Sequence, residues 1–230
     1  MSSIRLKILM NVLRLTKDAG NTTLSEIEDT VNSSSEKILH ILNSVESIVP
    51  IEIDENRLAI DSKGRLYLAS EIVALGGDPE NVAAFLRWQE FEEFCTEVLE
   101  RNSFQCTKRL RFKQDSWWEI DVVGGKKPII LCIDAKHWSL RPGKSAAIRR
   151  LIDKHIDRVR AFAQVLPTLK TKLGFLEWKK ATLIPGVVTL FQEAVELHQN
   201  VPVVPFFKFN QFIQELSVYS DQVLNLEGSI

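Results

Sequence analysis

Charged residues at the ends of two strongly apolar segments constrain this chain more than any other sequence feature. The first segment, residues 117–123, carries Glu119 and Asp121 among aromatic and β-branched residues, a composition typical of a strand. The second, residues 129–133, is apolar without a break and runs directly into Asp134-Ala135-Lys136. A buried carboxylate requires an ion pair or a metal ion, so the fold must supply partners where these segments end.

The two segments are expected to form a hairpin, because Gly124-Gly125-Lys126-Lys127-Pro128 between them is typical of a turn. Side chains alternate between the faces of a strand, so Asp134 and Lys136 point the same way. Glu119 and Asp121 do the same on the neighbouring strand. The pattern therefore predicts that acidic and basic groups converge at one end of the hairpin.

Two interpretations of this convergence stay open. In one, Lys136 forms a structural ion pair with Asp121 or Asp134, and replacing Asp134 by alanine would cost about 3 kcal/mol. In the other, the two acids repel each other as metal ligands, and the same replacement would cost little stability. The full pattern, an aspartate followed about a dozen residues later by Asp-x-Lys at a strand end, favours the functional site.

The composition indicates a soluble globular protein of one large or two small domains, with 230 residues, 45% hydrophobic residues and a net charge of -1. The first residues resemble no targeting signal, and no apolar run is long enough to span a membrane, so we expect a cytoplasmic protein without membrane contact. Cys95, Cys106 and Cys132 lie far apart in apolar patterns and are expected to be reduced core residues.

Charge is unevenly distributed along the chain. Residues 1–77 hold 8 Lys/Arg and 11 Asp/Glu, whereas residues 101–180 hold 19 Lys/Arg and 7 Asp/Glu. A basic field around an acidic pair suits a polyanion gripped along its backbone, which indicates DNA. The residues predicted to contact DNA are Lys108, Arg109, Arg111, Arg141, Lys144, Arg149, Arg150 and Lys154.

The N-terminal part has the pattern of a winged helix, with three helices followed by a hairpin at residues 51–60. Capping-box sequences begin at Thr23 and at Ser33. A further helix ends at Gly76-Gly77, which predicts a domain boundary, with one domain at residues 1–77 and another at 78–230.

The third helix of this winged-helix-like domain carries little positive charge. It offers Lys37 and His40 beside Glu36 and Glu46, whereas recognition of the major groove normally needs Arg or Lys. DNA binding and a protein contact, including homodimer formation, therefore both stay open for this domain.

The second half begins with a helix, straight or kinked, predicted from Asp78 to about Asn102. Glu92 lies at the edge of its apolar stripe and is expected to face the sheet. Strands are predicted at residues 104–113, 181–190 and 201–206, with a closing helix at 209–216. A basic helix after residue 144 places His155 on its inward side, either as a core histidine or as a site residue.

In this order of elements the second half resembles the PD-(D/E)XK nucleases, and is most similar to Mrr-type restriction endonucleases and archaeal Holliday-junction resolvases over about residues 80–218. The resolvases have glutamate or glutamine where this chain has Asp134. The segments that carry the match are Phe91-Glu92-Glu93-Phe94 through Phe104, Glu119-Ile120-Asp121-Val122 and Ile133-Asp134-Ala135-Lys136. The resemblance implies an α/β protein with a restriction-endonuclease-like αβββαβ core and a mixed central sheet, after a mostly α winged-helix domain.

The resemblance also implies a Mg²⁺-dependent endonuclease acting on DNA, with Mn²⁺ as a substitute. Asp121 and Asp134 would hold one or two ions with the Ala135 carbonyl, Glu92 would join through water, and Lys136 would position the attacking water. Glu119 and His155 are further candidates for the site. Two alternatives are a catalytically inactive DNA-binding regulator and a protein-interaction scaffold without a nucleic-acid partner.

Overall fold

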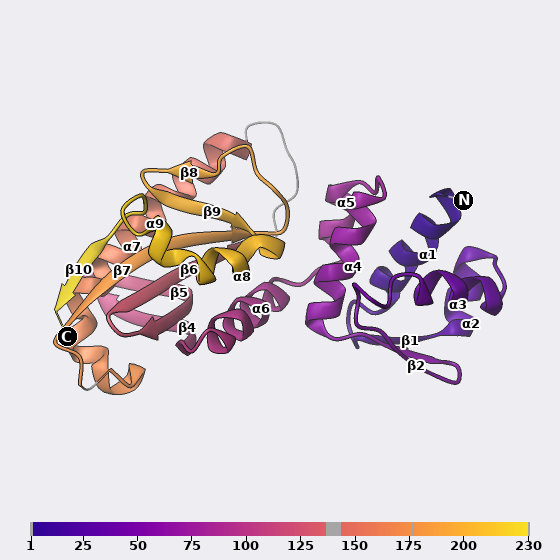
Figure 1. Ribbon diagram of the computed structural model, residues 1–230, viewed down its shortest axis with the longest axis horizontal. Coiled ribbons are helices and arrows are strands. Elements are labelled where there is room, and N and C mark those ends of the chain that lie inside the picture. The colour runs from indigo at the N-terminus through magenta and orange to yellow at the C-terminus, as the bar shows by residue number, and fades with distance from the viewer. Residues whose placement is uncertain (1, 137–143, 176, 230) are drawn as a thin grey trace. The chain divides into compact units, whose positions relative to one another are not determined.

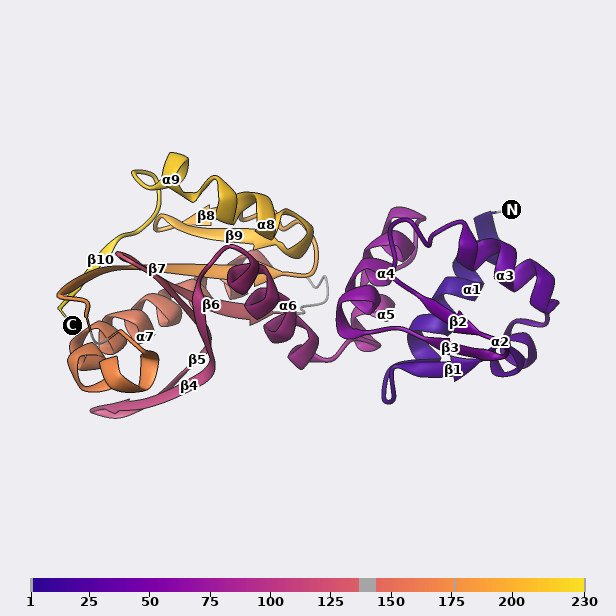
Figure 2. The ribbon, with the colours of Figure 1, turned by 60° about the horizontal axis from the view of Figure 1, so that its bottom comes forward.

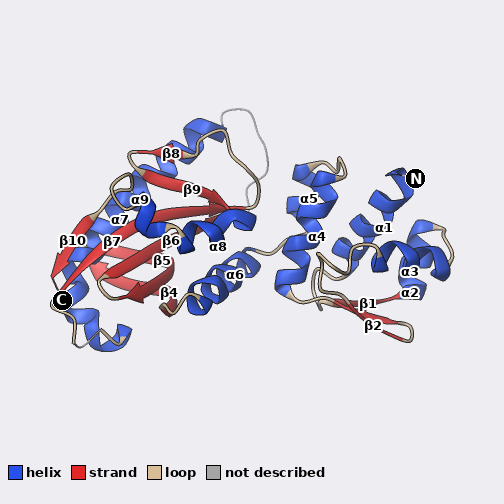
Figure 3. Ribbon diagram, in the orientation of Figure 1, coloured by secondary structure: helices blue, strands red, loops and turns tan. Residues whose placement is uncertain are grey.

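A computed structural model describes residues 2–136, 144–175 and 177–229 of the chain (Figure 1). These residues form two compact units, unit 1 up to Glu90 and unit 2 from Phe91. The mixed α/β class with a mixed sheet is confirmed (Figure 3). Among the described residues no helix is both long enough and apolar enough to cross a membrane.

Unit 1 combines helices with a small antiparallel sheet in the order β1-β3-β2. The predicted hairpin is present as β2 and β3, and a short strand before the second helix pairs with β3 as well. The elements are α1 Ser2–Leu15, β1 Asn21–Thr23, α2 Leu24–Val31, α3 Ser35–Asn43, β2 Glu52–Asp54, β3 Arg57–Ala59, α4 Ser62–Ala74 and α5 Pro79–Ala84.

One of the two predicted capping boxes forms. The Thr23 hydroxyl accepts from the Glu26 amide at 3.2 Å, and the Glu26 carboxylate accepts from the Thr23 amide at 3.0 Å. The capping box predicted at Ser33 is wrong, because α3 begins one residue later with Ser34 at its N-cap. Asn32, in the left-handed region, is the C-cap of α2. The chain therefore leaves one helix at Asn32 and enters the next at Ser34, not at Ser33.

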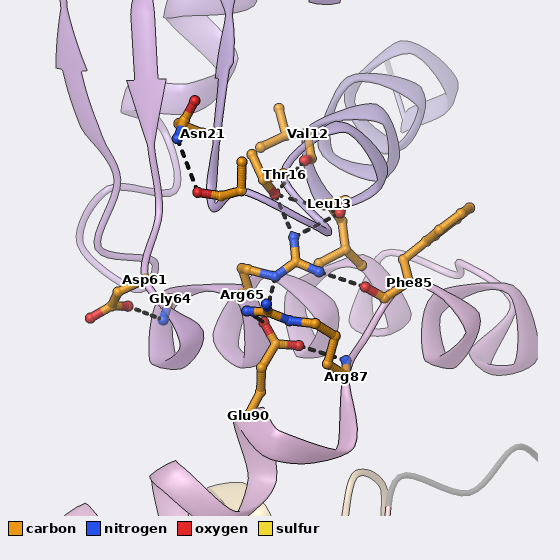
Figure 4. A network of polar contacts seen from close by, with 11 residues as sticks. Val12, Leu13, Thr16, Asn21, Asp61, Gly64, Arg65, Phe85, Arg87 and Glu90 are labelled. Carbon is orange, nitrogen blue, oxygen red and sulfur yellow. Dashed lines mark hydrogen bonds and ion pairs between the residues drawn. The ribbon is translucent and has the colours of Figure 1, made fainter.

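A polar cluster around the fully buried Arg65 organises the helices of unit 1 (Figure 4). Its Nε lies 2.6 Å from Glu90 Oε1, and its terminal nitrogens donate to the Leu13 carbonyl at 2.8 Å, to the Thr16 hydroxyl and to the Phe85 carbonyl. A buried guanidinium needs an anion and several hydrogen-bond acceptors. Here the anion is Glu90, and the acceptors lie at the end of α1 and directly after α5.

This cluster corrects two predictions about the chain around it. The division into units falls after Glu90, not after Gly77, so that Arg65 and the Glu90 carboxylate that pairs with it lie in the same unit. The helix predicted from Asp78 to Asn102 is broken between α5 and α6, Trp88–Arg101. Arg65 takes the Phe85 carbonyl, and the Glu90 carboxylate accepts from the Arg87 amide at 2.8 Å, so a new helix starts there.

Unit 2 contains a mixed sheet with the strand order β4-β5-β6-β7-β9-β8, with β10 paired to β7 (Figure 2). β6 and β9 run parallel to β7, and the other neighbours are antiparallel. The elements that follow α6 are β4 Gln105–Gln114, β5 Ser116–Lys126, β6 Ile129–Lys136, α7 Lys144–Leu173, β7 Lys180–Thr189, β8 Leu197–His198, β9 Val201–Pro205, α8 Phe206–Gln214, α9 Leu216–Tyr219 and β10 Leu226–Ser229.

Helices cover both faces of this sheet. α7 packs on β4, β5, β7 and β10, where Phe112 meets Phe162 with ring centroids 5.5 Å apart. α6 and α8 lie on the opposite face, and the rings of Phe94 and Phe206 meet edge to face at 5.4 Å. The layered arrangement explains why β6 is apolar on both sides up to Asp134.

The glycine pair predicted to form the β5–β6 turn lies inside β5. Gly125 packs under Phe175, and a β-carbon there would lie 2.2 Å from that ring, so glycine allows the aromatic ring to approach the strand. The turn consists of Lys127 and Pro128 only. The predicted hairpin is confirmed, but its turn lies later in the sequence than predicted, because Gly125 allows close packing against Phe175 and is not a turn residue.

The three cysteines are free thiols, as expected, but only Cys95 and Cys132 are buried. Cys106 is partly exposed on β4, where its Sγ lies 3.9 Å from the Thr96 carbonyl oxygen. Burial raises the pKa of the Cys106 thiol to about 12, so it remains protonated and unreactive at neutral pH.

Replacing Arg65 by methionine should lower the free energy of unfolding by about 3 kcal/mol or more, because it leaves Glu90 as an uncompensated buried charge. Urea unfolding followed by far-ultraviolet circular dichroism measures the change. Arg5→Met is the matched control, since Arg5 pairs with Glu71 at a partly exposed position and its loss should cost less than about 1 kcal/mol. Equal effects of the two variants would contradict a central role for Arg65.

Candidate active site

The candidate site lies where β5 and β6 separate. Their antiparallel register runs from Lys126 and Ile129 to Val122 and Ile133, and the next two residues in that register are Asp121 and Asp134. There the Asp121 Oδ2 accepts from the Ala135 amide at 2.9 Å, so a carboxylate takes the place of a strand carbonyl. The end of the ladder therefore brings together two acids from the two strands of the hairpin.

Lys136 bridges the two acids. Its Nζ lies 3.3 Å from Asp121 Oδ2 and 3.2 Å from Asp134 Oδ1. The Asp134 side chain is only 1% exposed, whereas Asp121 and Lys136 are 16% and 29% exposed. The convergence that the alternation of the strands predicted is present, and so are the ion pairs of the structural interpretation.

α7 supplies Arg158 to Asp134 and places His155 beside Arg158. Arg158 donates to Asp134 Oδ1 at 2.9 Å and lies 3.4 Å from His155 Nδ1. The other ring nitrogen of the fully buried His155, Nε2, lies 2.8 Å from the Cys132 carbonyl oxygen. Because arginine only donates and a carbonyl only accepts, this geometry requires neutral His155 with its proton on Nε2.

Charge interactions at the site set the pKa values of its groups in opposite directions. Burial and the nearby Asp134 carboxylate raise the pKa of Asp121. Burial also opposes ionisation of Asp134, but the positive charges of Lys136 and Arg158 and the hydrogen bond from Arg158 outweigh burial and lower the pKa of Asp134. Lys136 stays protonated, because the two acids outweigh its burial and raise its pKa.

Glu92 faces the sheet from α6, as predicted, and is 3% exposed. It does not join the two aspartates directly, because its Oε2 pairs with Arg109 Nε at 2.8 Å. Burial, the largest effect, raises the pKa of Glu92, and the charges of Asp121 and Glu119 act in the same direction. The Glu92 carboxylate is therefore close enough to interact with the charge of Asp121, where β5 and β6 separate.

Arg109 reaches Glu92 because its backbone is in the left-handed region, with φ +51°. The alternation of side chains along β4 reverses there. Cys106 and Phe112 lie an even number of positions apart and would share a face in a regular strand, but Cys106 contacts α6 and Phe112 packs on α7. Asp121 lies opposite this break, between the pairs Lys108–Val122 and Leu110–Ile120. A simple two-residue period in β4 therefore fails at Arg109.

A relative of this chain is a protein of Archaeoglobus fulgidus described as uncharacterized, which is 33% identical over 135 residues. The match covers 58% of this chain and 95% of the archaeal protein. The chain belongs to the same family as this archaeal protein. No family model matches the sequence.

Three solved structures show weak similarity. VC1899 from Vibrio cholerae has a TM-score of 0.36 with 12% identity, covering 95% of this chain and 51% of its own. Can2 from Sulfobacillus thermosulfidooxidans, solved with cyclic tetra-adenylate, has 0.34 with 13% identity, covering 92% and 50%. An McrB–McrC assembly from Thermococcus gammatolerans has 0.33 with 12% identity, covering 91% and 52%. This family member thus spans about half the length of each, and TM-scores this low define no shared fold.

The remaining predicted residues lie outside this cluster. Glu119 pairs with Arg111 on the exposed side of β5. Lys108, Arg149, Arg150 and Lys154 are exposed, the last three on α7. Arg141 lies outside the described residues, as does the side chain of Lys144.

Sequence reasoning missed Arg158. The available signal was its place on α7, one turn after His155 and one turn before Phe162, which puts it on the inward side of the helix. A charged residue on the apolar side of a helix indicates a buried partner, and here that partner is Asp134. Because Asp134 contacts two cations, its removal is now expected to cost stability.

Arg158→Met should lower the free energy of unfolding by about 3 kcal/mol, since buried Asp134 then keeps only Lys136. Arg160→Met is the matched control on the same helix, because Arg160 pairs with exposed Asp157 and should contribute less than about 1 kcal/mol. Urea unfolding of the two variants checks the difference. Similar losses in both would show that the Asp134–Arg158 pair adds no more than a surface pair.

Proposed function

We propose that this protein is a metal-dependent nuclease of the PD-(D/E)XK type that hydrolyses phosphodiester bonds in DNA. The observation that carries the proposal is the meeting of Asp121, Asp134 and Lys136 where β5 and β6 separate. Two carboxylates and a protonated amine at the end of a buried hairpin are suited to hold a cation beside a phosphate.

The arrangement of unit 2 supports this assignment. Its order α6-β4-β5-β6-α7-β7 corresponds to the αβββαβ core that the resemblance implies, with Asp121 on the second strand and Asp134-Ala135-Lys136 on the third. In unit 1, three helices and the β1-β3-β2 sheet support a winged-helix domain. Its helix α3 exposes both Glu36 and Lys37, a mixture of charges that suits a protein contact as well as DNA.

The donor set suits Mg²⁺. Asp134 Oδ2 is buried and has no hydrogen-bond partner among the described residues, so one carboxylate oxygen is left for a ligand. The described residues hold no group of three or more His, Cys, Asp or Glu side chains arranged for a metal, whereas Mg²⁺ is commonly bound by one or two carboxylates with water and phosphate. Asp121, Asp134 and the Ala135 carbonyl would hold it.

Each residue of the site has a distinct role in the proposed reaction. When bound, Mg²⁺ would act as a Lewis acid on the phosphate and lower the pKa of a bound water. Lys136 would donate hydrogen bonds to the attacking water and to the charge that develops on the phosphate. Arg158 and the Ala135 amide would hold the carboxylates of Asp134 and Asp121 in place, and Glu92 would act from α6 through water.

The exposed basic residues support DNA as the substrate. On α7, Arg149, Arg150 and Lys154 are exposed on the side of the helix away from Ile152 and Ile156. They are free to contact phosphates without disturbing the core. Arg109, in contrast, is held by Glu92 and is a weaker candidate for a phosphate contact than predicted.

A second candidate function is DNA binding without catalysis. It is favoured by the ion pairs of Asp134 with Lys136 and Arg158, which satisfy the buried acid without a metal ion. In that case the parent protein would bind DNA with the usual salt dependence and would not cut it when Mg²⁺ or Mn²⁺ is added.

The nuclease proposal is tested with labelled single-stranded, duplex and branched DNA in the presence of Mg²⁺ or Mn²⁺. Cleavage should require the metal ion, and Asp121→Asn, Asp134→Asn and Lys136→Met should each reduce its rate by about 100-fold or more. Circular dichroism confirms that each variant is folded.

Lys172→Met serves as the control, because Lys172 is an exposed lysine near the end of α7 and its replacement should leave the cleavage rate unchanged. Cleavage that persists in Lys136→Met, or that continues in excess EDTA, would rule out the proposed mechanism. Binding without cleavage by the parent protein would select the second candidate.

A further inference from the structure

The tip of the β4–β5 hairpin exposes a large aromatic side chain. Trp117 is 72% exposed, although a tryptophan normally buries most of its surface. Its cross-strand neighbour is Lys113, and the next pair on the same face of the hairpin is Arg111 with Glu119, which form an ion pair. An exposed indole is therefore displayed beside Lys113 at this end of the sheet.

The rest of the tip is anchored, so the exposure of Trp117 follows from a fixed backbone. Trp118 packs against the core on the α7 side, and its indole Nε1 donates to the Gln114 carbonyl at 3.2 Å. The Gln114 side chain donates to Gln164 of α7 at 2.9 Å. Because neighbouring side chains on a strand point to opposite faces, inward packing of Trp118 turns Trp117 outward.

Trp117 lies on the strand that carries Asp121, four residues before it. It shares a face of β5 with Glu119, opposite Trp118 and Ile120. The alternation of the strand reverses before Val123, which packs in the same core as Ile120. Four residues of strand span about 13 Å, a distance that a few nucleotides of an unpaired DNA strand cover. Arg111 and Lys113 lie beside this path on β4.

We propose that Trp117 stacks on an unpaired base of a DNA strand whose backbone passes Lys113 and Arg111 toward the site at Asp121. This inference rests on the proposed function, since it assumes that DNA reaches that site. Aromatic stacking is tolerant of base identity but needs a free base face, which the interior of a duplex does not offer. Trp117 thus selects DNA with a single-stranded segment near the scissile phosphate.

The proposal is tested by the affinity of the full-length protein for a single-stranded oligonucleotide and for a blunt duplex, in EDTA so that no cleavage occurs. Trp117→Ala should weaken single-strand binding by roughly 5- to 150-fold and duplex binding by less than about 2-fold. Trp117→Phe keeps an aromatic face and should recover most of the loss. Phe207→Ala is the matched control, since Phe207 is an aromatic residue 48% exposed on α8.

Two further measurements separate stacking from a general loss of binding. Trp117→Ala removes no charge and should leave the salt dependence of binding unchanged, whereas Lys113→Ala should reduce the log-log slope by about 1. An oligonucleotide with an abasic residue at the stacked position should bind the parent and Trp117→Ala equally. If the parent and Trp117→Ala bind the abasic oligonucleotide with the same affinity, the base that is missing is the one that contacts the indole.

The outcomes distinguish this inference from the proposed function. If the parent binds and cuts DNA and Trp117→Ala binds single strands as well as the parent does, stacking is overturned while the nuclease proposal stands. Equal weakening of duplex and single-strand binding also overturns it. If the parent binds no DNA, both proposals fail, and Trp117 belongs to a surface for another partner.

Discussion

The burial of one carboxylate determines much of unit 2. Asp134 ends an apolar strand at a position where only 1% of its side chain is exposed, and burial of an unpaired charge there would be prohibitive. Cations reach it from two elements, Lys136 from its own strand and Arg158 from α7. The long helix must therefore lie against β6 at a fixed register, which also buries His155 against the Cys132 carbonyl.

Unit 1 depends on the same principle with the charges reversed. There the buried group is the guanidinium of Arg65, and Glu90 together with three acceptor groups satisfies it. Glu90 lies in the first turn of α6, two residues before Glu92 in the sequence. In both units a buried ion pair specifies which helix packs where, at little net gain in stability.

The sequence was sufficient to predict features that depend on local periodicity. The side-chain period of a strand predicted that Asp121, Asp134 and Lys136 meet, and the helical period predicted that Glu92 faces the sheet. These predictions succeed because they depend only on side-chain direction along a single element. The mixed α/β architecture was implied by the resemblance in the order of the predicted elements.

The features that were missed depend on contacts between distant segments. Gly125 is a strand residue because Phe175 packs over it, and Arg109 reverses the alternation of β4 because its φ is positive. Arg158 is a site residue because α7 crosses beside β6, and β10 forms because the chain returns to β7. Arg158 left a signal in the helical period of the sequence, but its partner Asp134 and the other three features depend on residues far along the chain.

The central claim is that Asp121 and Asp134 hold a metal ion. Its most direct test is the binding of Mn²⁺ to the DNA-free protein, measured from the electron paramagnetic resonance signal of the unbound ion. The parent should bind Mn²⁺ in competition with Mg²⁺, Asp134→Asn should lose affinity by at least about tenfold, and Lys136→Met should still bind, because a protonated lysine offers no lone pair to the ion. Equal affinity in the parent and Asp134→Asn would show that the acids serve only as partners of Lys136 and Arg158, and would contradict the assignment of a metal-dependent site.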